Sequence, residues 1–225
     1  MPSKKVTWNY PVRPGTEEWK QLNSFKERLD AFNIPDDVLL EITTEELVKT
    51  CLEYPWWILI TSRDYNQEGY DFLKSVFNGF RELEKREDAG RELIKEYEKM
   101  NPEDIYKFDT LVKQGVFSFK FTYIELLLAQ KDIVKSINDK DLGLLIKKSS
   151  SVYNAKSEAF EKYSFYGIAS SCLILSRVLE VKRHDNFIIL GSELPEVVSY
   201  NKKGNSVNKE LLDHICNEAL TLLKN

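Results

Sequence analysis

Apolar residues recur every three or four positions along most of the chain, which is the spacing expected for the buried face of an α-helix. The first such stripe follows Thr16, a predicted N-cap, and consists of Trp19, Leu22, Phe25, Leu29 and Phe32. A short helix over 37–40 and a longer helix that begins after the cap Thr43 show the same pattern. The N-terminal part of the chain is therefore predicted to be helical.

The middle of the chain keeps this periodicity, interrupted by residues that favour helix ends. One predicted helix ends at Asn78-Gly79, and a highly charged helical stretch follows over 80–100. The next helix is predicted to begin at Asn101, which precedes a proline, and to end at Gly115.

Three later segments need a choice between helix, strand and loop. Residues 116–121 alternate between apolar and polar, but the spacing beyond them is helical, so we favour one helix over 118–130. The most apolar stretch, 166–181, belongs to a predicted buried core helix over 164–181. Residues 187–190 are the one candidate strand, and 191–207 are predicted to form a mobile loop.

The pattern as a whole predicts an all-α fold of about ten helices, in an antiparallel, superhelical or orthogonal-bundle arrangement. One helix is capped by Asn138 or its neighbour, and the last covers 211–222. Prolines concentrate in residues 1–15, which we expect to form an extended N-terminal arm. Residues 16–225 are expected to form a single α-helical domain, without internal repeats.

Composition narrows the classes of function. The 225 residues are 42% hydrophobic and 30% charged, and 32 basic against 36 acidic side chains give a net charge of −4. A chain of this size can bury a large core without a disulfide or a metal. The mild acidity and the lack of a Lys/Arg block argue against nucleic-acid binding, since that affinity depends on cations that meet phosphates.

The apolar run 166–181 contains Arg177 and several serines and is shorter than the roughly 20 residues of a membrane span. We therefore expect no membrane span. No apolar segment follows the basic N-terminus, so no signal peptide is recognised. The chain as written is expected to be cytoplasmic, or secreted if a leader was removed.

Metal, redox and nucleotide chemistry have little support in the sequence. The cysteines Cys51, Cys172 and Cys216 lie in helical patterns and are expected to be buried free thiols, with a Cys172–Cys216 disulfide as the less favoured alternative. The two histidines, His184 and His214, lack the spacing of metal ligands. Because no phosphate-binding or nucleophile-elbow motif occurs, we expect no metal and no cofactor.

Several local strings resemble an uncharacterised family of α-helical proteins of Bacteroidetes and other bacteria. The strings are PGTEEWKQL (14–22), IPDDVLLEITTEELVKTCLEYP (34–55), FNGFRELEKREDAG (77–90) and FTYIELLLAQ (121–130). The resemblance covers about the first 130 residues. Family members often look secreted or lipid-anchored, which the start of this chain does not reproduce. No activity attaches to the resemblance, so it implies no catalytic residues.

Glu125 is the most unusual carboxylate, because it interrupts an otherwise apolar segment. A buried acid there needs a cation or hydrogen-bond donors. The favoured interpretation is an outer-edge position or a structural ion pair with an arginine such as Arg81 or Arg86. The alternative is a ligand-facing acid in a cleft with a raised pKa.

Aromatic residues gather between positions 54 and 72, and this cluster is the leading candidate for a binding surface. Its members are Tyr54, Trp56, Trp57, Tyr65, Tyr70 and Phe72. Such rings most often pack in a core, but an exposed part would suit a protein, a peptide or a sugar. We therefore expect a non-enzymatic module that binds a protein or peptide between helices. The alternative is a small helical enzyme that uses a buried carboxylate such as Glu125.

Overall fold

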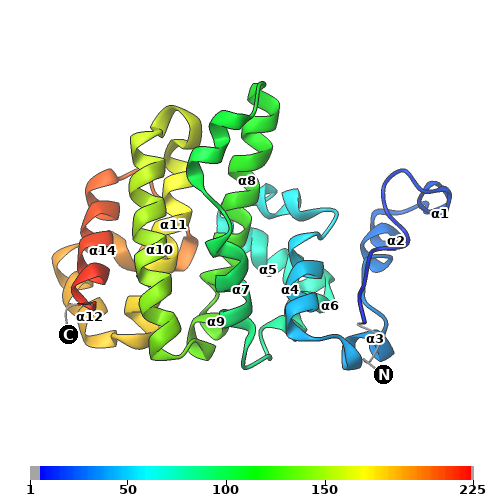
Figure 1. Ribbon diagram of the computed structural model, residues 1–225, viewed down its shortest axis with the longest axis horizontal. Coiled ribbons are helices and arrows are strands. Elements are labelled where there is room, and N and C mark those ends of the chain that lie inside the picture. Colours follow the sequence, from blue (N-terminus) through cyan, green and yellow to red (C-terminus); the bar gives the residue numbers. More distant parts are fainter. Residues whose placement is uncertain (1–5, 224–225) are drawn as a thin grey trace.

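The computed structural model describes residues 6–223 and, at residue 184, the backbone alone, so the histidine side chain considered there lies outside the described part. Every regular element within this range is helical, which confirms the predicted all-α class. Figure 1 shows that the chain progresses along the long axis, from the N-terminal arm at one end to the last helices at the other.

The N-terminal half consists of short helices. They are α1 (Glu17–Lys20), α2 (Phe25–Asp30), α3 (Asp36–Glu41), α4 (Thr44–Leu52), the 3-10 helix η1 (Trp57–Thr61), α5 (Asn66–Val76), α6 (Asn78–Leu83), α7 (Ala89–Glu98) and the 3-10 helix η2 (Pro102–Lys107). The single helix predicted after Thr16 is therefore wrong. Ser24 divides it, because its hydroxyl accepts the Glu27 N–H while the Glu27 carboxylate accepts the Ser24 N–H in a capping box.

Two predicted helix ends also differ in the structure. Asn78 begins α6 instead of closing the helix before it, and its side-chain amide pairs with the backbone of Ile34: the oxygen accepts from the Ile34 N–H at 2.9 Å and the nitrogen donates to the Ile34 carbonyl at 2.7 Å. Asn101 caps a helix as predicted, but that helix is short, and Thr110 starts the next one with Gly115 inside it.

The C-terminal half contains the long helices. Long and short together, the helices of this half are α8 (Leu111–Leu128), α9 (Lys131–Ser136), α10 (Asp139–Glu158), α11 (Phe160–Lys182), α12 (His184–Glu193), α13 (Glu196–Lys203) and α14 (Lys209–Thr221). The favoured helix over 118–130 is confirmed and begins earlier, and Asn138 caps α10 as predicted.

The strand predicted over 187–190 and the loop predicted over 191–207 are both wrong. The first lies inside α12, where Phe187 and Leu190 are buried three residues apart on one face. The second contains the end of α12 and all of α13, where Val197 and Tyr200 are buried with the same spacing. Both segments are too short for periodicity alone to separate helix from strand, and packing against α11 decides them.

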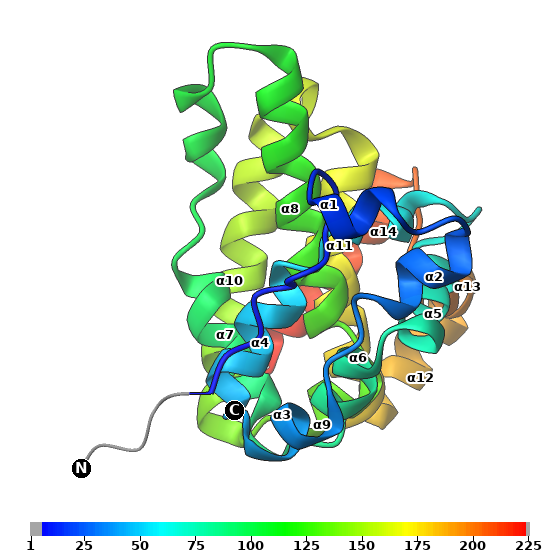
Figure 2. The same cartoon turned by 90° about the vertical axis from the view of Figure 1, so that its right-hand side faces the viewer.

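Helix α11 is the centre of the fold. It packs against α8, α10 and α14, and the short helices α9, α12 and α13 also contact it. Figures 1 and 2 show that α10 runs antiparallel to α8 and α11, and α11 packs against both of the other helices. At 23 residues, α11 is long and apolar enough to cross a membrane, but 72% of its most apolar window is buried inside the protein.

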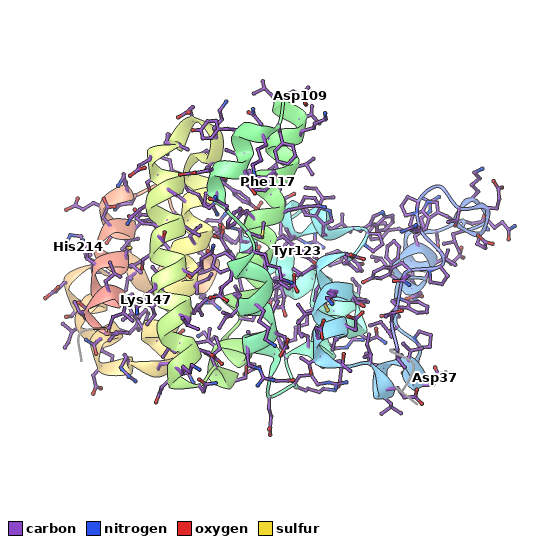
Figure 3. The ribbon with its side chains drawn as sticks, in the orientation of Figure 1. Asp37, Asp109, Phe117, Tyr123, Lys147 and His214 are labelled. Carbon is purple, nitrogen blue, oxygen red and sulfur yellow. The ribbon has the colours of Figure 1, made fainter. Side chains whose placement is uncertain are left out.

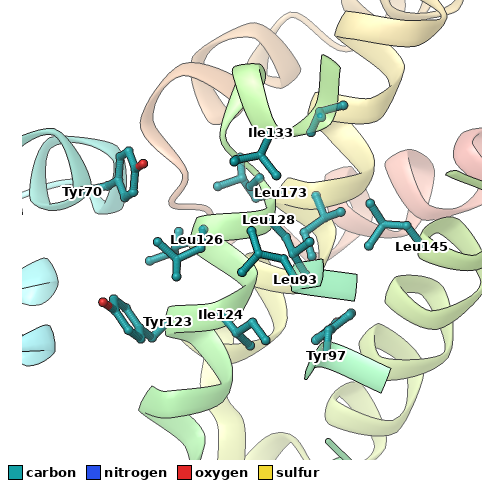
Figure 4. Close-up of a cluster of buried hydrophobic side chains, with 14 of the residues drawn as sticks. Tyr70, Leu93, Tyr97, Tyr123, Ile124, Leu126, Leu128, Ile133, Leu145 and Leu173 are labelled. Atoms are coloured by element: carbon teal, nitrogen blue, oxygen red, sulfur yellow. The ribbon is translucent and has the colours of Figure 1, made fainter. Parts of the chain in front are cut away.

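The core continues from α11 through α8 into the N-terminal half. All residues from Phe121 to Leu128 are buried, so the lower half of α8 has no solvent-facing side. Figure 4 shows Tyr123 and Leu126 directed toward Tyr70 of α5, while Leu128 lies beside Leu93 of α7. Helix α8 therefore joins the short N-terminal helices to the long C-terminal ones.

The three cysteines are free and buried, as the sequence favours. Burial raises the pKa of each thiol: Cys51, Cys172 and Cys216. In the unfolded chain a thiol ionises near pH 9, whereas in the folded chain it keeps its proton to higher pH. The folded state then binds more protons than the unfolded state, so stability falls as the pH rises above that value.

We expect the free energy of unfolding, measured by urea denaturation, to decline between about pH 8 and about pH 10. The decline should be smaller in Cys51→Ala, since this variant lacks one of the two thiols that have no exposed surface. An identical pH dependence in the variant would contradict a contribution from Cys51.

Two helical glycines allow a test of packing, because replacing each by alanine should change the free energy of unfolding in opposite directions. A Cβ atom on Gly69 of α5 would lie 1.8 Å from the Ile60 carbonyl oxygen of η1, whereas one on Gly115 of α8 would meet nothing within 4 Å. We expect Gly69→Ala to lower the free energy of unfolding by about 1–3 kcal/mol or more through overpacking. Gly115→Ala should raise it by about 0.5–1 kcal/mol through helix propensity. Urea denaturation of both variants checks this pair, and equal effects would contradict it.

Candidate functional site

The aromatic cluster predicted as a binding surface does not form one surface. Tyr54 and Tyr70 are buried in the core, where Tyr54 contacts Phe32, Phe77 and Phe80 at ring-centre distances of 4.8–5.7 Å. Tyr70 donates to Glu84 at 2.6 Å. The rings of these two tyrosines therefore serve packing, the commoner role of such residues.

Trp56 and Tyr65 are partly buried and face other elements. The Trp56 indole packs against Trp19 at 5.2 Å and Phe25 at 5.3 Å, so α1 and α2 cover it. Tyr65 precedes α5, and the Lys203 ammonium lies 4.4 Å from its ring centre and donates to its hydroxyl at 3.2 Å. These contacts use each ring to join distant parts of the chain.

Trp57, one of the predicted site residues, is partly exposed and lines a cleft. Its ring lies 5.9 Å from Tyr123 of α8, and it lines a cleft of about 620 Å³ between the N-terminal arm, the end of α4 and α8. The cleft is also lined by Tyr54, Arg13, Lys120 and Glu53. Figure 2 faces the side of the molecule where the arm crosses α4.

The N-terminal arm forms one wall of this cleft because Tyr10 anchors it. The Tyr10 ring is buried between Phe32, Tyr54 and Phe77, and its hydroxyl donates to the Thr50 carbonyl at 2.7 Å. Its φ of 47° is in the left-handed region, which a tyrosine rarely adopts. The buried contacts must therefore hold the backbone in this conformation.

The polar groups of the cleft have spare binding capacity. The buried Tyr54 hydroxyl has no hydrogen-bond partner among the described residues. Within the same part of the chain, neither Arg13 nor Lys120 forms an ion pair, and both side chains are exposed. With Glu53 as the acidic side chain in the wall, the cleft has an excess of positive charge.

An exposed apolar stripe on α8 leads toward this cleft. Val112, Val116 and Phe119 are 76%, 45% and 37% exposed, although they are large hydrophobic residues. Their spacing places them on the helix face that carries Tyr123 one turn further on, where Trp57 covers it. Figure 3 shows that this end of α8, marked by Asp109 and Phe117, projects beyond the body that surrounds Tyr123. The stripe was missed because the sequence pattern divided α8 at Gly115.

Glu125, the other predicted site residue, lies in the centre of the core with no exposed surface. One carboxylate oxygen accepts from Tyr97 at 2.9 Å and Ser171 at 2.6 Å. The other accepts from the Lys156 ammonium at 2.7 Å and from the Ser170 hydroxyl. Helices α7, α8, α10 and α11 each contribute a group to this cluster.

Lys156 is as deeply buried as its partner. Its ammonium also donates to the Gly167 carbonyl at 3.0 Å and lies 4.3 Å from the centre of the Phe121 ring. Burial lowers the pKa of Lys156, and the attraction of Glu125 opposes that shift. The cation is thus held by a counterion, a carbonyl and an aromatic face, which together replace water.

The structure corrects both the predicted partner of Glu125 and its proposed cleft. The ion pair that the sequence favours does exist, but with Lys156 instead of Arg81 or Arg86. Arg86 pairs with Glu82 at 2.7 Å. Since Glu125 has no exposed surface and four internal donors, it does not face a ligand.

Comparisons of the chain with protein-family models, with curated proteins and with solved structures found no match. Among the side chains that the structure describes, no group of three or more from His, Cys, Asp and Glu is placed to hold a metal ion. The interpretation of this protein therefore rests on its own geometry.

We expect Glu125→Gln to destabilise the protein by about 3–5 kcal/mol, because it leaves the Lys156 ammonium buried without a counterion. The double variant Glu125→Gln/Lys156→Met should recover a large part of that loss, since it removes the charge and keeps an acceptor for Tyr97. Urea denaturation of the single and double variants measures both effects. A double variant less stable than Glu125→Gln would show that the ammonium does not cause the loss.

Proposed function

We propose that this protein is a non-enzymatic binding module that takes a peptide segment of another protein in the Trp57 cleft. The observation that supports this most strongly is the junction of an exposed apolar helix stripe with a cleft of positive charge. Proteins rarely expose such a stripe without a use for it, because its hydration is unfavourable.

The chemistry of the surface indicates the kind of peptide. Arg13 and Lys120 are exposed and without ion pairs in the described part of the chain, so a carboxylate between them would gain charge-assisted hydrogen bonds. Val112, Val116 and Phe119 would bury apolar side chains of the same segment. The proposed occupant is therefore an acidic peptide with apolar residues on one side.

The Tyr54 hydroxyl adds a directional group to this proposal. It is buried, lacks a partner and borders the cleft, so a peptide carbonyl or carboxylate that reaches it would satisfy its donor. Trp57 would provide the aromatic wall beside it, a residue type that often dominates binding energy at interfaces.

The alternative function, a small helical enzyme with a buried carboxylate, has less support. Glu125 has no exposed surface, and its oxygens already accept from Tyr97, Ser171, Ser170 and Lys156. A substrate could reach this carboxylate only if α8 and α11 separated. The geometry therefore favours a structural role for Glu125 over a catalytic one.

A displayed library of short peptides, selected on the immobilised full-length protein, tests the proposed function. We expect enrichment of peptides that combine acidic and apolar residues, with affinity at least about tenfold weaker for Lys120→Glu and for Val116→Asp. Lys147→Glu is the matched control, because this lysine is exposed on α10 at a distance from Tyr123 and Phe117 (Figure 3). Circular dichroism verifies that each variant is folded.

Two results would contradict the proposal. One is a selection that enriches no acidic, apolar peptides. The other is a set of enriched peptides that bind Lys120→Glu and Val116→Asp as tightly as they bind the unaltered protein.

A further inference from the structure

A second cleft, with a volume of about 520 Å³, lies between α5, α9, α11, α12 and α13. Figure 2 shows α5, α12 and α13 together on one flank of the molecule. Its lining residues are different from those of the Trp57 cleft, and most are polar or charged. A cleft of this size holds a small molecule.

Arg177 of α11 is 3% exposed and is the most deeply buried of the cations that line this cleft. Its guanidinium donates to the Asn201 carbonyl at 2.7 Å, to the Gln67 side chain at 2.9 Å and to the Ala129 carbonyl at 3.3 Å. All three acceptors are uncharged, and no described carboxylate forms an ion pair with it. A guanidinium has five N–H donors, so part of its capacity remains for an anion.

The same cleft contains acidic groups with unused acceptors. Glu180 lies three residues after Arg177 on α11, and one of its oxygens accepts from Lys131 at 2.6 Å. Its other oxygen is buried and has no partner among the described residues. Asp71 accepts from Gln67 at 2.9 Å and forms no ion pair in the described part of the chain.

Together these groups present a buried cation that forms no ion pair in the described part of the chain, beside a carboxylate oxygen that accepts no hydrogen bond there. Arg177 and Glu180 are neighbours on the surface of α11, because residues three apart on a helix have Cβ atoms about 5–6 Å from each other. An anion alone would satisfy Arg177 but would be repelled by Glu180. A ligand that carries an ammonium and a carboxylate on the same carbon atom can satisfy both groups.

We propose that this cleft binds a free α-amino acid, with its carboxylate on Arg177 and its ammonium on Glu180. Phe187 and Val198 give the wall at α12 and α13 an apolar part, which suits an apolar side chain on the ligand. The site would be a small-molecule site separate from the peptide cleft.

Isothermal titration calorimetry of the full-length protein tests this proposal, with L-leucine and L-phenylalanine as probes. N-acetyl-L-leucine, which lacks the ammonium, and L-leucinamide, which lacks the carboxylate, separate the two charges. We expect at least one of the two free amino acids to bind, and both analogues to bind about tenfold more weakly or not at all.

Two variants test which residue binds each charged group of the ligand. Glu180→Gln should weaken amino-acid binding about tenfold, while any residual binding of N-acetyl-L-leucine is unchanged or stronger. Arg177→Lys should weaken the binding of every probe that carries a carboxylate, and circular dichroism verifies its fold. The control Lys147→Glu should bind as the unaltered protein does.

No binding of either free amino acid would overturn the proposal. Equal affinity for L-leucine and N-acetyl-L-leucine would also overturn it, since the site would then be specific for anions alone. Neither outcome depends on Trp57 or on the exposed stripe of α8. Each is therefore distinguishable from failure of the proposed peptide-binding function.

Discussion

The buried ion pair between Glu125 and Lys156 is the constraint around which the rest of the structure is arranged. Burial of either charge without the other would be energetically unfavourable. Helices α8 and α10 must therefore meet at the level of this pair. Ser170 and Ser171 bring α11 to the same point, and Tyr97 brings α7. Apolar contacts could be made at several relative positions of these helices, whereas hydrogen bonds to a buried carboxylate allow few. The cluster therefore specifies how four helices meet, in addition to any stability it provides.

The position of this pair also explains why one helix serves both the core and the surface. Below the level of Phe121, α8 is surrounded by α5, α7 and α11, and its side chains are buried on every side. Above that level it extends beyond η1, where Val112 and Val116 are 76% and 45% exposed and Phe119, which packs on Tyr166 of α11, keeps 37% of its surface exposed. The rigidity of the buried half holds the exposed half in place, so a partner would meet an ordered surface and would lose little entropy to ordering it.

Local sequence signals predicted the start of a helix correctly where a polar side chain accepts a backbone N–H group of the helix that it begins. Thr43, Asn101 and Asn138 accept backbone N–H groups of their helices as expected. The predictions were wrong where the signal was local but the partner was distant. Asn78 looks like a helix end in the sequence, yet its amide pairs with Ile34, 44 residues away. For the short helices α12 and α13, contact with α11 supplied the stability that their own sequences do not reveal.

By itself, the sequence determined the all-α class, because apolar spacing of three to four residues specifies a helix with one buried face. It also identified Glu125 as an acid that needs a partner. Only the tertiary structure decided that the partner is Lys156, that Tyr54 and Tyr70 lie in the core, and that Trp57 borders a cleft. The physical reason is that periodicity records which side of a helix avoids water, whereas the choice of the facing helix depends on contacts between residues far apart in the chain.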